Sequence, residues 1–138
     1  MIIGFTGTSS EISYTQGTAL AKVVMHLEAK EAHHGDCVGA DAAFDRICAD
    51  LLITRHAHPG LGKPGKSSKR AYCGAEVIHT PLPYLERNRV IVNLSDVLIA
   101  CPSGPERLRS GTWSTVRYAR NVERPVYIVW PNGVVEHD

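Results

Sequence analysis

The sequence has no long apolar run and almost no net charge, and each absence argues against a class of protein. No stretch approaches the roughly 20 consecutive apolar residues that a membrane-spanning helix needs. The formal net charge of +1 over 138 residues provides no broad basic field for nucleic acid or an anionic membrane. We therefore expect no membrane partner, and we consider nucleic acid only as a minor alternative.

Closely spaced cysteines are also absent. The four cysteines stand at positions 37, 48, 73 and 101, with no C-x-x-C pair. Zinc sites usually draw their ligands from such pairs, so reduced thiols in a cytoplasmic protein are the simpler interpretation. The first ten residues, MIIGFTGTSS, have neither the charged start nor the long apolar stretch of a signal peptide, which agrees with an expected cytoplasmic location.

What the sequence does contain is a regular alternation of strand and helix patterns. We expect strands at residues 2–6, 32–37, 52–57, 76–79, 96–101 and 125–130, and helices at 15–30, 40–51, 84–94 and 112–120. The polar segment 58–72 is expected to be a loop. Strands that alternate with helices predict an α/β fold: one Rossmann-like three-layer domain over residues 1–138, with a mainly parallel central sheet.

In such sheets ligands bind beyond the carboxyl ends of the strands, where four loops are expected to meet. Ser110, Gly111 and Thr112 follow the most apolar strand and begin a helix, so they predict a phosphate site built from hydroxyls, a close backbone and the positive end of a helix dipole. Thr115 belongs to the same segment. The first loop repeats this chemistry with Gly7, Thr8 and Ser9. The alternative is that these hydroxyls only cap helices.

Two acids stand among glycines in the second loop, HHGDCVGADAAF, which begins at residue 33. Gly35 and Gly39 permit tight turns, and Asp36 and Asp41 could accept hydrogen bonds from the hydroxyls of a ribose. The alternative for Asp41 is a purely structural role at the start of the following helix.

Arginines and histidines supply the remaining candidates. Arg87 and Asn88 are expected near the ligand, because Arg87 and Arg89 point about 200° apart on a helix and cannot both face it. His33, His34, His56 and His58 raise the alternative of a metal site, because His56 and His58 alternate along a strand and could project to one face. No metal-binding spacing such as H-E-x-x-H is present, so the sequence predicts neither a metal nor a cofactor.

Taken in order, these motifs resemble the SLOG superfamily, which includes the DNA-processing protein A family and the lonely-guy phosphoribohydrolases. The closest stretch is RNRVIVNLSDVLIACPSGPERLRSGTWSTVRYARNVERPVYIV, residues 87–129, and the glycines of the first two loops also match in order. The resemblance implies a nucleotide or nucleotide-derived ligand held by Gly7, Gly39, Ser110, Gly111 and Thr112.

The resemblance leaves the fate of that ligand open. The lonely-guy motif Pro-Gly-Gly-x-Gly-Thr-x-x-Glu, aligned on Gly111 and Thr112, puts Thr115 where its catalytic glutamate belongs. Our first hypothesis is therefore a binding protein that acts as a sensor, carrier or sequestering protein. Whether it is a monomer or a homo-oligomer stays open at this point. The second is a nucleotide N-glycosidase or related transferase that uses Asp36, Asp41 or Glu11. The third is a nucleic-acid-binding module using the basic segment from Lys63 to Arg70. The overlapping loop from Gly60 to Lys69 is a candidate lid over a ligand.

Overall fold

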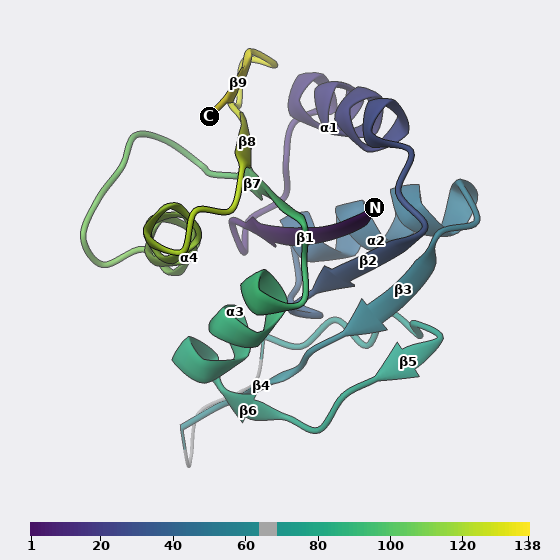
Figure 1. Ribbon diagram of the computed structural model, residues 1–138, viewed down its shortest axis with the longest axis vertical. Coiled ribbons are helices and arrows are strands. Elements are labelled where there is room, and N and C mark those ends of the chain that lie inside the picture. Colours follow the sequence, from purple (N-terminus) through teal and green to yellow (C-terminus); the bar gives the residue numbers. More distant parts are fainter. Residues whose placement is uncertain (64–68) are drawn as a thin grey trace.

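Seven strands form one sheet through the middle of the protein in the computed structural model, which describes residues 1–63 and 69–138 (Figure 1). The strands are β1 (Ile2–Gly7), β2 (Glu31–His34), β3 (Thr54–Ala57), β5 (Val77–Ile78), β7 (Val97–Cys101), β8 (Val126–Val129) and β9 (Val135–His137). Their order in space is β5-β3-β2-β1-β7-β8-β9. All neighbours are parallel except β8 and β9, so the predicted α/β fold with a mainly parallel sheet is confirmed.

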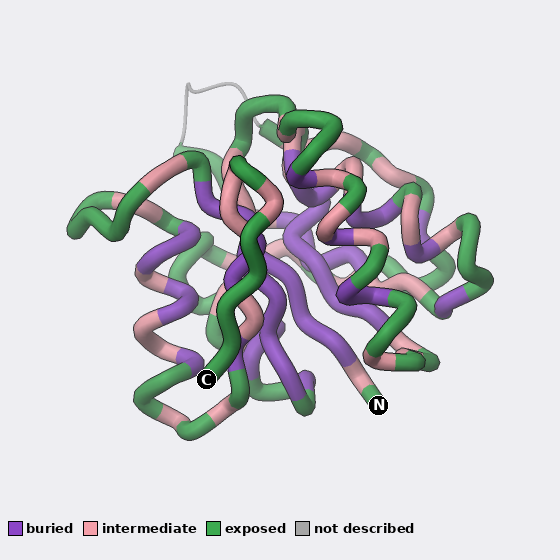
Figure 2. The backbone as a smooth tube through the Cα atoms, turned by 90° about the horizontal axis from the view of Figure 1, so that it is seen from above, coloured by how far each residue is buried: buried purple, intermediate pink, exposed green. Residues whose placement is uncertain are grey.

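Four helices cover the two faces of the sheet: α1 (Tyr14–Leu27), α2 (Ala40–Asp50), α3 (Tyr84–Asn93) and α4 (Gly111–Asn121). The helices α1 and α2 pack on one face, and α3 and α4 pack on the other. Figure 2 shows the buried strands running between the helices. No helix among the described residues is long and apolar enough to cross a membrane.

The central strand β7 shows why two helical layers are needed. All five of its residues are buried, and they alternate between two hydrophobic cores. Val97, Ile99 and Cys101 pack under α1 and α2, whereas Leu98 and Ala100 pack under α3 and α4. A strand buried on both faces reads as a continuous apolar run, which is why this strand was the clearest in the sequence.

The structure corrects two expectations about the strands. Residues 125–130 were expected to contain the last strand, but β9 follows β8 and pairs with it antiparallel. The segment 58–72 was expected to be a loop, yet it contains β4 (Gly60–Leu61), which pairs with β6 (Leu82–Pro83). Residues 64–68 of the expected loop, including Lys66 of the proposed basic segment or lid, lie outside the described residues.

The strand order creates a crevice between β1 and β7. These strands are neighbours, but the chain leaves β1 toward β2 on one side and leaves β7 toward β8 on the other. The loops after the two strands therefore diverge, and this is where open α/β sheets bind ligands. Gln16 of α1 anchors the ends of β7 and β8, because its buried side-chain amide donates to the carbonyl oxygens of Pro102 and Val129 at 3.0 and 2.8 Å.

Candidate ligand-binding site

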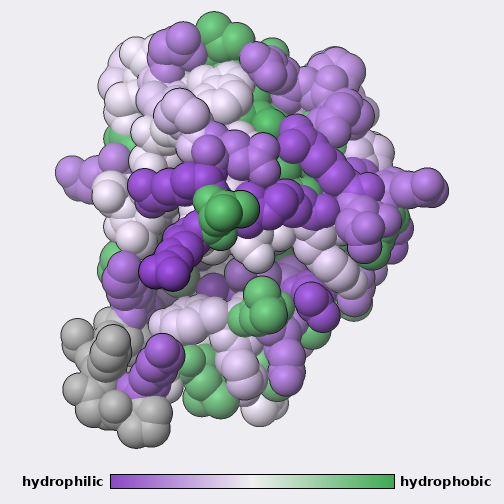
Figure 3. Space-filling view, turned by 90° about the vertical axis from the view of Figure 1, so that its left-hand side faces the viewer, coloured by the Kyte–Doolittle hydropathy of each residue, from purple (hydrophilic) through white to green (hydrophobic). Residues whose placement is uncertain are grey.

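A cavity of about 480 Å³ opens at the carboxyl ends of β1 and β7. Ten residues that the sequence predicted as ligand-binding line it: Gly7, Thr8, Ser9, Gly35, Asp41, Arg87, Asn88, Ser110, Gly111 and Thr112. Figure 3 views this edge of the sheet and shows strongly hydrophilic side chains gathered over its middle. The structure therefore brings three separate loops and one helix face to a single polar cavity.

The first turn of α4 forms one wall of the cavity. Ser110 is the N-cap, and its hydroxyl accepts a hydrogen bond from the backbone N–H of Trp113 at 3.2 Å. The capping role considered from the sequence is thus real, but it leaves the N–H groups of Gly111 and Thr112 without intrahelical acceptors. A Cβ atom added to Gly111 would meet no heavy atom within 4 Å, so packing does not demand glycine there.

Arginines surround this turn. Arg107 and Arg109, from the loop between β7 and α4, line the cavity together with Arg87. Asp41 is the only carboxylate among the described lining residues. With three guanidinium groups, one carboxyl group and the positive end of a helix dipole, the cavity favours an anion.

Gly39 brings the first two loops together. Its backbone has φ of 89°, which L side chains rarely adopt, and an added Cβ would lie 2.5 Å from the carbonyl carbon and oxygen of Ser9. The amide of Ala40 donates to the carbonyl of Thr8 at 3.0 Å across the same contact. Gly39 does not line the cavity, and its role in the structure is to let the β1–α1 loop and the start of α2 touch.

Arg87 joins the ends of β2 and β3. Its side chain is buried, and one guanidinium nitrogen donates to the carbonyls of Gly35 and His58 at 2.8 and 2.9 Å. Its Nε donates to Asn88 at 2.8 Å. Arg89 instead lies over the ring of Tyr118, at 5.2 Å from its centre, so the two arginines face different ways as the helical geometry predicted. Arg87 therefore combines a structural role with a place on the cavity wall.

Two ionisable groups, Asp41 and Cys37, lie beside Arg87 in the cavity. Burial raises the pKa of Asp41, against the opposing effects of His34 and Arg87, and the carboxylate accepts a hydrogen bond from the backbone N–H of Cys37 at 3.1 Å. Burial and the nearby Asp41 raise the pKa of the Cys37 thiol to about 11. Cys37 is therefore a neutral thiol at neutral pH and is not activated as a nucleophile.

Asp36, in contrast, points away from the cavity. Its buried carboxylate accepts from Arg70 at 3.0 Å and from the backbone N–H of Cys73 at 2.9 Å. Both oxygens are thus used to attach the segment around residue 70 to the end of β2. The second loop needs two acids because each faces a different neighbour: Asp36 holds the chain, and Asp41 faces the cavity.

Two other predicted residues also lie off the cavity. Glu11 is exposed and does not line it. Thr115 is buried, and its hydroxyl donates to the carbonyl of Gly111 at 2.8 Å. Sequence reasoning missed several lining residues, chiefly Ser103, Gly104, Arg107 and Arg109. Their position in the β7–α4 loop was the available signal, because that whole loop was expected at this edge.

Comparisons with known proteins support the fold. No family model and no curated protein matches the sequence. Among solved structures, the molybdenum cofactor binding protein from Rippkaea orientalis is 24% identical, with a TM-score of 0.70 over 94% of this chain and 76% of that one. The molybdenum cofactor carrier protein from Chlamydomonas reinhardtii is 18% identical, with a TM-score of 0.62 over 92% and 74% of the two chains.

A third match is DNA processing protein A from Streptococcus pneumoniae, which is 22% identical with a TM-score of 0.68 over 91% of this chain. The chain spans about half the length of that protein, 49%. At these identities the likeness shows a shared fold. It agrees with the Rossmann-like fold that the resemblance implies.

Proposed function

We propose that the protein binds a nucleotide or nucleotide-derived small molecule at the carboxyl edge of its sheet, with the ligand's phosphate at the start of α4. The observation that carries the proposal is Gly111, which opens onto the cavity at a helix N-terminus where no packing contact requires a glycine. An anion there would receive backbone N–H donors, the helix dipole and the guanidinium groups of Arg107 and Arg109.

The volume and lining of the cavity support a ligand larger than a free phosphate ion. Its volume of about 480 Å³ falls within the usual range of small-molecule sites. The loop after β1 and the carboxyl group of Asp41 lie on the same cavity as α4. Asp41 is therefore the residue we assign to the hydroxyls of a sugar, at a distance from the phosphate.

Binding without turnover, as in a carrier, sensor or sequestering protein, is the form of this function that the site supports best. Of the three acids considered for catalysis, Glu11 and Asp36 lie off the cavity, and Thr115 stands where the lonely-guy enzymes have their glutamate. Two proteins of the same fold are named for binding or carrying the molybdenum cofactor, which favours a carrier or binding role for this chain.

Asp41 keeps N-glycosidic cleavage as a second candidate function. Its carboxyl group lies in the cavity, where it could assist departure of a base from a bound nucleotide. Its raised pKa favours the protonated form of the carboxyl group. Only the carboxylate form would stabilise positive charge developing at the sugar, so the raised pKa counts against this second function.

One experiment separates the two functions. The purified protein is incubated with nucleoside 5′-monophosphates, deoxynucleotides, ADP-ribose and molybdopterin-type compounds, and thermal stability and free base are followed in the same samples. A ligand of the folded state raises the melting temperature. We expect a shift with the compound recovered intact. Release of free base that is lost in Asp41→Asn would establish the glycosidase instead, and no shift with any compound would contradict the proposed site.

A further inference from the structure

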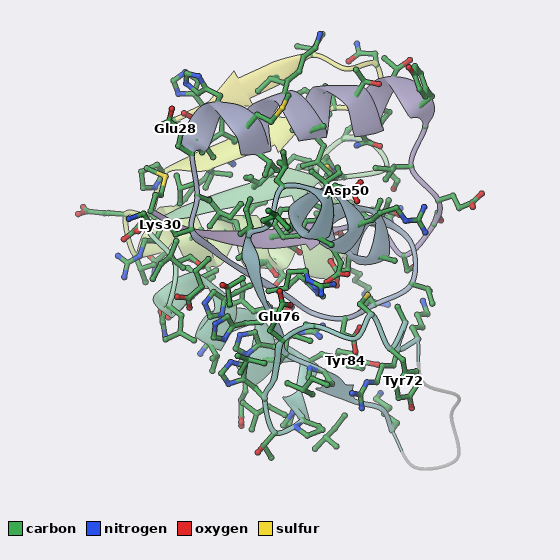
Figure 4. All side chains as sticks on the ribbon, turned by 90° about the vertical axis from the view of Figure 1, so that its right-hand side faces the viewer. Glu28, Lys30, Asp50, Tyr72, Glu76 and Tyr84 are labelled. Carbon is green, nitrogen blue, oxygen red and sulfur yellow. The ribbon has the colours of Figure 1, made fainter. Side chains whose placement is uncertain are left out.

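Four histidines form a cluster on the sheet, away from the cavity. Glu31 and His33 of β2 project to the same face, and His56 of β3 stands directly beside His33 in the strand register. His58 and His79 follow β3 and β5 on that face. Figure 4 views the edge of the sheet from which the strands begin, with Lys30 labelled before β2 and Glu76 before β5. The cluster therefore spans the three neighbouring strands β2, β3 and β5.

The imidazoles are joined in two chains that begin at one carboxylate. In the first, Glu31 Oε1 lies 2.8 Å from His33 Nε2, and His33 Nδ1 lies 2.7 Å from His58 Nε2. In the second, the same oxygen lies 3.0 Å from His56 Nε2, and His56 Nδ1 lies 2.9 Å from His79 Nε2. The rings of His58 and His79 then stack with their centres 4.0 Å apart.

Proton counting shows which nitrogens have lone pairs. The carboxylate of Glu31 accepts hydrogen bonds, so Nε2 of His33 carries the proton and its Nδ1 has a lone pair. That lone pair points at His58. His33 and His58 are each only 2% exposed, whereas Glu31 is 34% exposed. In the ion-free cluster His58 donates its Nε2–H to the lone pair of His33, so the lone pair of His58 lies on Nδ1. An ion bound between the two rings would take Nδ1 of His33 and Nε2 of His58, and the proton of His58 would move to its Nδ1. The cluster has its more open side at Glu31.

We propose that His33, His58 and His79 bind one divalent transition-metal ion, of which Zn²⁺ is the best fit, with a water as the fourth ligand. One nitrogen from each of these residues lies within 4.8 Å of the others. Three imidazoles plus an open position form a familiar zinc-binding set. Glu31 is the outer carboxylate, because it accepts the second N–H of His33 and so orients the ring, as metal-bound histidines commonly require.

The assignment requires the rings of His33 and His58 to spread and the ring of His79 to turn, because the rings of His58 and His79 stack only 7° from parallel and the in-plane lone pairs of parallel rings do not meet at one ion. Zinc binds imidazole nitrogen at about 2.0–2.1 Å, so tetrahedral ligand nitrogens lie roughly 3.3 Å apart. The hydrogen bond between His33 and His58 would open by roughly half an ångström to admit the ion. Burial lowers the pKa of His33, His58 and His79, which keeps the imidazoles neutral and able to coordinate.

A second cluster provides a useful contrast. His34, Asp45 and Cys73 also lie within ligand distance of one another. Asp45 is already neutralised by Arg55 at 2.7 Å and accepts from His34 at 2.8 Å, and the other nitrogen of His34 accepts from the backbone N–H of Asp36 at 2.9 Å. A cation there would face the guanidinium group of Arg55, which already pairs with the carboxylate of Asp45.

The proposed ion would join β3 and the end of β2 to the segment after β5. The strand β5 has only two residues, and both are exposed. Little buried apolar surface therefore holds it against β3. A metal bridge to His79 would stabilise this edge, which makes the ion structural in its effect and the predicted readout one of binding and stability.

The test uses metal-free full-length protein titrated calorimetrically with Zn²⁺, and with Co²⁺ for its visible spectrum. We expect one Zn²⁺ per chain, a rise in melting temperature, and a cobalt spectrum of low coordination number. His79→Ala should weaken zinc binding at least 100-fold. Glu31→Gln, which keeps an acceptor for His33, should weaken it about tenfold. His26→Ala removes a histidine of α1 outside the cluster and should change nothing.

Several results would overturn the assignment. These are no zinc bound by the wild type, His79→Ala binding as tightly as the wild type, or Glu31→Gln losing more affinity than His79→Ala, which would make Glu31, His33 and His56 the ligands. NMR of the wild-type imidazoles is independent of any variant's folding. Zinc should shift the ring signals of His33, His58 and His79 and leave those of His26 and His137 in place; the reverse would contradict the site.

Discussion

The cavity beside β7 and the histidine cluster beside β5 lie on the same sheet but offer opposite chemistry. The cavity presents N–H donors: the first turn of α4 and the guanidinium groups of Arg107 and Arg109. The cluster presents imidazole nitrogens, whose tautomers are ordered by the carboxylate of Glu31. The helix α4 begins at the first region. One region is therefore suited to an anionic ligand and the other to a cation.

The largest expected effect comes from a negative charge that is placed in the cavity while the histidine cluster is left unchanged. Ser110→Asp keeps a good N-cap but sets a carboxylate beside the proposed phosphate, so we expect nucleotide affinity to fall about 100-fold or more. Ser110→Asn keeps the cap without charge and should lose much less. Calorimetric titration with nucleotide and then with Zn²⁺ measures both regions. Loss of zinc binding in Ser110→Asp would show that the two regions are not independent.

The next effect concerns a glycine that serves the fold. Gly39→Ala forces a side chain onto a backbone with φ of 89° and against the carbonyl of Ser9. We expect a loss of about 2 kcal/mol or more in the free energy of unfolding, measured with urea. Gly17→Ala, inside α1, is the control and should gain about 0.5–1 kcal/mol. Equal stability of Gly39→Ala and the wild type would contradict the close loop contact.

A smaller effect is expected from the cavity arginines. Arg107→Ala and Arg109→Ala should each weaken binding of a phosphorylated ligand about five- to tenfold and reduce its dependence on salt, since each removes a cation from a partly exposed site. Arg120→Ala, at the far end of α4 and paired with Asp138 at 3.0 Å, is the matched control. If all three variants bind alike over a salt series, the arginines do not contact the phosphate.

The smallest effect is a pH dependence. The pKa of Asp41 is raised in the folded protein above its ordinary value of 3.8. Its contribution to stability is therefore fully present below pH 3.8 and is lost as pH rises through the folded-state pKa. Asp41→Asn should remove this loss, so the variant gains on the wild type as pH rises over that window. Urea unfolding across acidic pH measures the difference, with Asp50→Asn as the control. Parallel curves for wild type and Asp41→Asn would contradict the shift.

The fold was predictable where one short segment carries the whole pattern. The buried strand β7 and the helix after Ser110 were evident because apolar period and capping residues are local signals. The strand β9 was not, because its three residues are all exposed and carry no apolar alternation. The strands β4 and β6 pair across about twenty residues. With two residues each, they are too short to show an apolar pattern in the sequence.

The site was predictable as a set of loops but not in its division of roles. Asp36 and Asp41 look alike in sequence, yet the partners of Asp36 are 34 and 37 residues away along the chain. The histidine cluster was incomplete in the sequence for the same reason. His56 and His58 showed an alternating spacing, but His79 comes from another strand end, and only the sheet register brings it to them.

The claim that a phosphate sits at the start of α4 is tested most directly by NMR of the backbone amides during titration with a nucleotide that raises the melting temperature. We predict that the amide signals of Gly111 and Thr112 shift most and saturate with the same affinity as the thermal effect. Saturation with those two amides unmoved, and the largest shifts elsewhere on the protein, would contradict it.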